Sequence, residues 1–168
     1  MRAVRSFCVG MFVLALVACG SEEAQRNPSG VAPSATLSDN TCGPFTAGAP
    51  GVLNAFCDGT ATVTVTVADA QHVLRGGSCS ISRTLYTLNA GALLSPSDTR
   101  PPPDYVGMVS QVQDGPFTNA VLSANLGGRS YVLAQNTGEV SAAGGTFAGT
   151  ATVLGGGRVQ ITGSFTCQ

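Results

Sequence analysis

The stretch that decides the fold is TATVTVTV at residues 60–67, the most regular alternation of polar and apolar side chains in the protein. A period of two puts the valines on one face of a strand and the threonines on the other, so one face packs on a core while the other meets water. We expect residues 71–75 to return as the hairpin partner of this strand. A short helix over residues 67–74, ended by Gly76, is the alternative, and the hairpin is favoured.

Further strands are expected wherever apolar residues alternate between turn signals. They cover residues 52–57, 84–89, 105–113, 118–126, 129–135, 147–153 and 159–167, with a short strand at best at 139–142. Turns are expected at the Asp-Gly of residues 114–115, the Gly-Gly of residues 127–128 and the glycine run of residues 155–157. Short strands separated by turns in this way predict a single all-β domain, built as an antiparallel sandwich or a small barrel.

The stretch from Ala90 to Asp104 is the longest that the sequence predicts to be irregular. It contains Pro96 and the run PPP at residues 101–103, and proline neither donates to a strand ladder nor continues a helix. Loops of this length inside a domain are commonly functional or mobile. We therefore predict that this loop contacts a protein or surface partner.

The N-terminal residues have the pattern of a lipoprotein signal peptide. Two arginines precede an apolar run at residues 7–17, which suits an export signal and is shorter than the roughly 20 residues that a transmembrane helix needs. The lipobox LVAC at residues 16–19 ends in Cys19, whose sulfur would carry diacylglycerol and whose new amino group would be acylated. A plain secretory signal that ends at Ala18 and an uncleaved membrane helix are the alternatives.

Cleavage before Cys19 divides the chain into three parts. Residues 1–18 are the signal peptide, residues 19–39 are the lipidated cysteine with a flexible tether rich in Ser, Pro, Ala and Glu, and residues 40–168 are the β-domain. Two or more acyl chains hold a protein stably on a membrane. We therefore expect a lipid-anchored protein of the cell envelope. Because no aspartate follows Cys19 at the second position, the outer membrane is favoured, with the domain exposed to the periplasm or the cell surface.

Composition excludes several classes of partner. The mature chain has six arginines, no lysine and nine acidic residues, a formal charge of minus three. It therefore lacks the basic surface of a nucleic-acid-binding protein and a polybasic patch for anionic lipids. The absence of tryptophan weakens a sugar-binding interpretation, and a small aromatic patch remains an expectation. That patch would consist of Tyr86, Tyr105 and Tyr131.

The domain contains four cysteines once Cys8 is assigned to the signal and Cys19 to the lipid. They are Cys42, Cys57, Cys79 and Cys167. Four cysteines in an exported domain predict two disulfides with three alternative connectivities. We favour one disulfide that closes the local Gly/Pro loop from Cys42 to Cys57 and one that attaches the last strand, through Cys167, to Cys79. A zinc site is disfavoured, because no C-x2-C spacing occurs and the chain has one histidine.

His72 is that single histidine, so any general base or Ser-His-Asp arrangement would have to use it. Asp69 lies three residues upstream, but the chain has no G-x-S-x-G motif. A lone polar histidine beside a turn is usually solvated. We therefore assign no catalytic residue, and a hydrolase is the least favoured function.

Other ligand chemistries have little support. The glycines at residues 155–157 lack the Lys-Ser or Lys-Thr that follows in a phosphate loop. Asp98, Asp104 and Asp114 have no EF-hand register, and the acids of the domain show no spacing that suggests glycoside hydrolysis. We predict no cofactor and no metal.

The C-terminal part of the chain resembles a known family. The runs GTFAGT at residues 145–150 and GRVQITGSFTC at residues 157–167 are similar to the ending of the mycobacterial lipoprotein-antigen family. Proteins of this family also have a lipobox, a tether rich in Pro, Ser, Thr and Ala, an internal cysteine and a last strand that ends on a cysteine.

The resemblance covers residues 79–167 and implies a surface-exposed all-β lipoprotein with adhesive or antigenic behaviour. It carries over Cys19 and the pair of Cys79 and Cys167, and it assigns no catalytic residue. The other two domain cysteines depart from the family pattern.

These observations predict a membrane-anchored protein whose non-catalytic β-domain acts as a surface interaction or structural protein. The alternative is a carrier or sensor of an apolar ligand, with the stretch from Ala90 to Asp104 as its lid. That alternative predicts an enclosed apolar cavity of roughly several hundred Å³ between the sheets.

Overall fold

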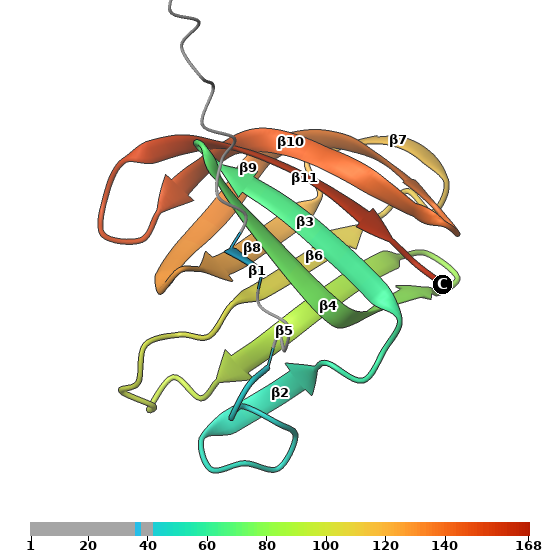
Figure 1. Ribbon diagram of the computed structural model, residues 1–168. Helices are drawn as coiled ribbons and strands as arrows, with labels where there is room; N and C mark the ends of the chain where they lie inside the picture. Colours follow the sequence, from blue (N-terminus) through green and yellow to red (C-terminus); the bar gives the residue numbers. More distant parts are fainter. Residues whose placement is uncertain (1–35, 38–41) are drawn as a thin grey trace, which may run out of the picture. The chain divides into compact units, whose positions relative to one another are not determined.

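The computed structural model describes residues 36–37 and 42–168, and it confirms the all-β prediction. These residues form eleven strands, and no helix among them is long and apolar enough to cross a membrane (Figure 1). The strands are β1 (Thr36–Leu37), β2 (Val52–Phe56), β3 (Ala61–Val67), β4 (Ala70–Ile81), β5 (Tyr86–Leu94), β6 (Tyr105–Ser110), β7 (Gly115–Thr118), β8 (Val121–Leu126), β9 (Arg129–Ser141), β10 (Gly144–Val153) and β11 (Arg158–Thr166).

Eight of the strands form one closed antiparallel barrel. Their order is β3, β4, β5, β6, β8, β9, β10, β11, and β11 returns to pair with β3, from Ile161 opposite Val67 to Thr166 opposite Thr62. Apart from the short β7, neighbours in the barrel follow one another along the chain, so the barrel is an up-and-down meander. Of the two architectures that the sequence analysis left open, the structure has the barrel.

The barrel interior is filled by the apolar side chains that the alternating pattern predicts. In β3, Val63 and Val65 are fully buried, whereas the threonines between them are only partly buried on the outer wall. An eight-stranded barrel encloses a space just wide enough for side chains. The other large, fully buried side chains are Leu74, Tyr86, Leu88, Val106, Met108, Leu122, Leu126, Leu133, Val140 and Ile161.

The barrel has a seam where β4 and β5 separate. The two strands pair only over the last four residues of β4. Towards the other end, the edge of β4 pairs with β1, through Thr36 opposite His72 and Leu37 opposite Val73, and the edge of β5 pairs with β2. Figure 1 shows β1 beside β4 and β2 beside β5. The two outer strands thus satisfy backbone groups that the separation would leave unpaired.

The predicted turns between β3 and β4, at residues 127–128 and at residues 155–157 are confirmed, whereas the turn predicted at residues 114–115 is not, because Gly115 lies in β7. β3 and β4 form a hairpin around Ala68 and Asp69, so the helical alternative is wrong: this segment continues the ladder opposite the valines of β3. Ala68 has a φ of 51°, a left-handed conformation that alanine disfavours. Gly127 and Gly128 join β8 to β9 with φ values of 56° and 75°, the two positive values of the turn that matches strand twist.

The predicted break between residues 135 and 139 is wrong, because β9 continues through it without interruption. β9 changes partner here, from β8 to β7. The buried side-chain amide of Asn136 donates hydrogen bonds to the carbonyls of Ala120 and Leu133, at 2.7 and 2.9 Å. A sequence that is typical of a turn therefore stays in a strand, because Asn136 satisfies carbonyl groups at the gap between the two partners.

The stretch from Ala90 to Asp104 is not irregular throughout. β5 continues to Leu94, and only residues 95–104 form a loop. No proline precedes Pro96 in this segment, and β5 has β6 on one edge and β2 on the other, with Ala92 opposite Ala55. The backbone before the first proline therefore has the partners of a regular strand.

Two short strands were not predicted. β7 contains Gly115, which was expected in a turn, and Pro116, which is tolerated because β9 is the only strand paired with β7 in the described part of the chain. β1 falls within residues 19–39, the predicted tether, and pairs with β4. The signal peptide, Cys19 and the other tether residues lie outside the described residues.

Both disulfides have the connectivity favoured from the sequence. Cys42 is bonded to Cys57 with Cα atoms 6.0 Å apart, and Cys79 is bonded to Cys167 with Cα atoms 5.8 Å apart. The loops they close span 15 and 88 residues. In the chain-entropy model such loops contribute about 3 and about 4 to 5 kcal/mol, respectively.

We predict that Asn136→Ala lowers the free energy of unfolding by about 1 to 3 kcal/mol, because two buried carbonyls lose their donor. Denaturant unfolding of the disulfide-intact protein measures this change. Gln135→Ala is the matched control, since Gln135 is the exposed neighbour on the same strand, and its effect should stay within about 0.5 kcal/mol. Equal stability of the two variants would contradict the role given to Asn136.

Candidate functional site

Three pockets in the described part of the chain are open to solvent. One of about 300 Å³ surrounds the Cys79–Cys167 disulfide, one of about 320 Å³ lies beside His72 at the other end, and one of about 640 Å³ lies between the end of β6, β7 and the start of β8. The barrel interior is filled by side chains instead. The enclosed apolar cavity that a carrier would need is therefore not provided by the space between the strands.

His72 points into the barrel end where the β3–β4 and β8–β9 turns lie. Its side chain is 15% exposed, and its Nδ1 lies 3.5 Å from Oδ2 of Asp104. The other carboxylate oxygen of Asp104 accepts a hydrogen bond from the Gly127 N–H at 2.8 Å. Asp104 thus links β4, the start of β6 and the β8–β9 turn on the side of the barrel where β4 and β5 have separated.

This histidine–carboxylate pair has no nucleophile beside it. Among the described residues that line the pocket there is no Ser, Thr or Cys, and the only hydroxyl belongs to Tyr131. The partner of His72 is Asp104 rather than Asp69, which lies in the β3–β4 turn. The pair therefore holds the seam of the barrel, and a Ser-His-Asp reaction has no support in this geometry.

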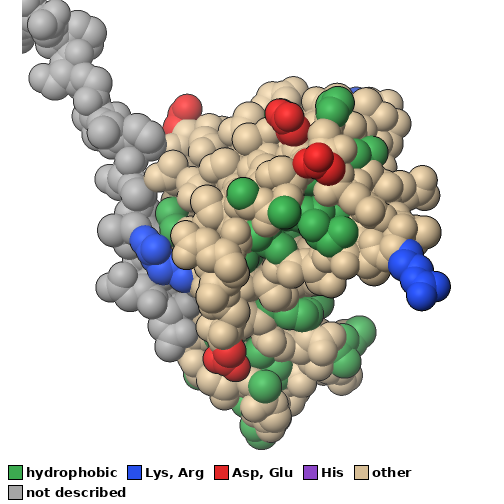
Figure 2. Space-filling model, turned by 90° about the vertical axis from the view of Figure 1, so that its right-hand side faces the viewer, with side chains coloured by type: hydrophobic (Ala, Val, Ile, Leu, Met, Phe, Trp, Pro, Cys, Tyr) green, Lys and Arg blue, Asp and Glu red, His purple; other side chains and the backbone are tan. Residues whose placement is uncertain are grey.

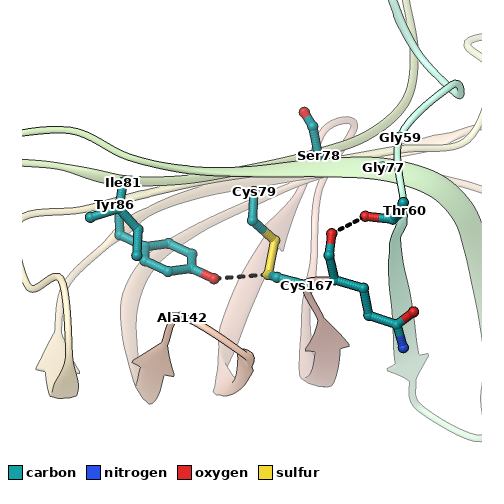
Figure 3. A pocket seen from close by; sticks show the side chains of 10 residues that line it. Gly59, Thr60, Gly77, Ser78, Cys79, Ile81, Tyr86, Ala142 and Cys167 are labelled. Carbon is teal, nitrogen blue, oxygen red and sulfur yellow. Dashed lines mark hydrogen bonds between the residues drawn. A yellow bond between two sulfur atoms is a disulfide. The ribbon is translucent and has the colours of Figure 1, made fainter.

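The opposite end is organised around the Cys79–Cys167 disulfide. Figure 3 shows the ring of Tyr86 pointing towards the disulfide, with its hydroxyl 3.0 Å from Cys167 Sγ. Since a disulfide sulfur carries no proton, the hydroxyl is the donor. Burial raises the pKa of Tyr86, so the phenol stays protonated at neutral pH. The Thr60 hydroxyl donates to the Gln168 carbonyl nearby. These groups close the end of the barrel and offer no general base.

Figure 2 shows this same end of the molecule from outside. Hydrophobic side chains gather in the middle of the face, and Asp, Glu and Arg side chains lie around them. Cys79 and Cys167 pack against the hydrophobic core, and Ile81, 48% exposed, lines the pocket. The face is thus an apolar centre with a charged surround rather than a polar cleft.

The expected aromatic patch is wrong, because all three tyrosines are buried. Tyr86 is at the disulfide end and Tyr131 at the His72 end. Tyr105 packs against Phe56 with ring centroids 6.2 Å apart, and its hydroxyl donates to Asn89 Oδ1 at 2.8 Å. Burial also raises the pKa of Tyr105. The three tyrosines therefore pack in the interior of the domain and do not form a surface on which a sugar ring could stack.

Arg100 holds the proline-rich loop in place. Its Nη2 lies 2.6 Å from Asp98 Oδ2 and donates to the Pro50 carbonyl at 2.7 Å. Its guanidinium carbon lies 5.0 Å from the centre of the Phe45 ring, a cation–π distance. These contacts join the 95–104 loop to the loop inside the Cys42–Cys57 disulfide. The spacing of Asp98 and Arg100 is visible in the sequence. The hydrogen bond from Arg100 to the Pro50 carbonyl, 50 residues away, is not.

The aspartates of the domain are dispersed. Asp98 pairs with Arg100, Asp104 pairs with His72, and Asp114 lines a separate pocket with Glu139. No group of three or more His, Cys, Asp or Glu in the described ranges is placed to hold a metal ion. Cys19 lies outside those ranges.

No family model matches the chain, and neither a curated protein nor a solved structure matches it. The resemblance to the mycobacterial lipoprotein-antigen family therefore stays a prediction.

We predict that Asp98 titrates near pH 2 and that Arg100→Gln moves its pKa towards the ordinary value of 3.8. The hydrogen bond from the Arg100 side chain, followed by the bond from its backbone N–H, holds the Asp98 pKa at about 2. Because this pKa lies below 3.8, the pair favours the folded loop at higher pH and loses that effect as the pH falls through about 2. Carbon-13 NMR of the carboxyl group measures the titration.

Arg83→Gln is the control for this titration, because Arg83 lies in the exposed β4–β5 turn. It should leave Asp98 unchanged. A wild-type Asp98 that titrates at its ordinary pH would show that Arg100 does not hold the loop.

Proposed function

We propose that this protein is a lipid-anchored, non-catalytic β-barrel of the bacterial cell envelope that acts as a surface interaction or structural protein. The observation that carries the proposal is the lipobox ending at Cys19, followed by a domain with two disulfides. Disulfides persist in exported proteins and are rare in the cytosol. Acylation of Cys19 would attach the barrel to a membrane, with the outer membrane favoured.

A non-catalytic role is supported by the state of the few reactive groups. His72 is paired with Asp104, and the described residues that line its pocket include no Ser, Thr or Cys. The Cys79–Cys167 disulfide is covered by the buried phenol of Tyr86. An enzyme would need an acid, base or nucleophile placed at one reacting centre. The filled interior also speaks against a carrier that encloses its ligand between strands.

The surface that we propose for a partner is the 95–104 loop together with the 42–51 loop. Pro96 and Pro101 are exposed, and Arg100 fixes both loops to each other. A surface that is ordered before binding loses little conformational entropy on association. These loops can therefore present a defined shape without a catalytic centre.

The proposal predicts the mass of the protein purified from membranes. We expect a chain that begins at Cys19 and carries diacylglycerol with or without a further acyl group, and reduction should add the four hydrogens of two disulfides. Cys19→Ala should release an unmodified protein into the soluble fraction, because the anchor is lost.

Cys8→Ala is the matched control, since Cys8 lies within the signal and should not affect anchoring. Recovery of the wild-type protein in soluble fractions, with Cys19 unmodified, would contradict the proposal.

A further inference from the structure

We infer that the open pocket beside His72 binds a small organic carboxylate with an apolar body, such as a medium-chain alkyl carboxylate. The pocket lies at the end of the barrel formed by the β3–β4, β8–β9 and β10–β11 turns, on the left in Figure 1. Its volume of about 320 Å³ falls at the lower end of the roughly 300 to 1,000 Å³ of small-molecule sites. The inference goes beyond the proposed interaction role and does not depend on lipidation.

The apolar part of the pocket comes from several strands. Val67, Leu126, Val153 and Val159 line it together with Ala70. Val67 and Leu126 belong to the buried core, and the two other valines pack against it. The floor is therefore the top of the filled barrel, and it offers an apolar surface large enough for a short alkyl chain but not for a ligand that penetrates the interior.

Tyr131 supplies an unpartnered polar group to this apolar pocket. The residue is 7% exposed and lines the pocket. By contrast, the buried hydroxyls of Tyr86 and Tyr105 each have a hydrogen-bond partner. Within the described residues the Tyr131 hydroxyl forms no hydrogen bond. The Tyr131 oxygen is not one of the buried unpaired polar atoms of the described residues, so it is open to solvent and available to a ligand that enters the pocket.

Arg129 supplies the charge. It lies two residues before Tyr131 on β9, so both side chains are on the same face of the strand, and both line the pocket. Arg129 forms no ion pair with any described residue. The guanidinium can only donate hydrogen bonds and the phenol hydroxyl can also donate, so a carboxylate can accept from both. The ligand head is therefore an anion rather than a cation.

Asp104 does not cancel this preference. It does not line the pocket, and its two oxygens are directed at His72 Nδ1 and at the Gly127 N–H. Asp104 thereby fixes the ring of His72, a positioning role, while Arg129 contributes its guanidinium to the described lining of the pocket. An alkyl carboxylate places its head between Arg129 and Tyr131 and its chain against the valines.

Octanoate is the probe that tests this site. The full chain carrying Cys19→Ala, which removes only the proposed anchor, is titrated with octanoate and followed by amide NMR. We expect saturable shifts at the three turns around the pocket, with a Kd of about 10 µM to 1 mM. Octanol and octylammonium, which share the chain but not the carboxylate, should bind at least about tenfold more weakly.

Matched variants locate the head group. Arg129→Gln should weaken octanoate binding by about tenfold or more, because it removes the positive charge that faces the carboxylate, and Tyr131→Phe by a smaller factor, because it removes one neutral donor. Arg158→Gln should leave binding unchanged, since Arg158 is an exposed arginine near the same end that does not line the pocket.

Three results would overturn the inference: no saturable shift with octanoate, octanol binding as tightly as octanoate, or equal effects of Arg129→Gln and Arg158→Gln. The ligand series uses no substitution in the pocket, so it stands even if a pocket variant fails to fold. Because all measurements use protein without the Cys19 lipid, their failure is separate from any failure of the proposed anchor.

Discussion

Closure of the barrel by the pairing of β11 with β3 is the constraint on which the rest of the structure depends. The other pairings of the barrel join strands that follow one another closely, and turns such as Gly127–Gly128 set them up locally. The β11–β3 pairing instead brings Ile161 opposite Val67, two residues that are distant in sequence. The chain must therefore lose the conformational entropy of closing a long loop before the contacts between these strands can form. The Cys79–Cys167 disulfide lies beside this pairing and spans 88 residues. It limits the unfolded chain where the closure is most costly.

Closure also determines where ligands and partners can bind. With eight strands, the interior is filled by the valines of β3 and by side chains from all the other strands. Binding is then left to the ends of the barrel and to the loops outside it. The seam between β4 and β5 shapes one of these ends: β1 and β2 cover the separated edges, and His72 and Asp104 tie the wall together where the ladder is missing.

Much of this fold follows from local patterns in the sequence. The alternation at residues 60–67 and the glycine pair at 127–128 predict a strand and a turn because each depends on its own side chains and backbone angles. The continuous β9 was missed, since the amide of Asn136 reaches the carbonyl of Ala120 in the short segment between β7 and β8, and no local pattern reports that contact. The choice between barrel and sandwich was open for the same reason, as it depends on which distant strand β11 meets.

The candidate site, too, could be predicted from the sequence only in part. The single histidine directed attention to His72, but its partner Asp104 lies 32 positions away and has no signal in the sequence. The Asp98–Arg100 pair is close in sequence, whereas its use to join two loops depends on the fold. The lipobox remains the feature of the proposed function that the sequence alone carries.

Amide hydrogen exchange of the disulfide-intact protein tests barrel closure most directly. A closed barrel predicts that β3 and β11 exchange as slowly as β9 and β10, because each of these strands is paired on both edges. Exchange of β3 or β11 at the rate of β7, which has one partner in the described part of the chain, would show an open sheet and contradict the account.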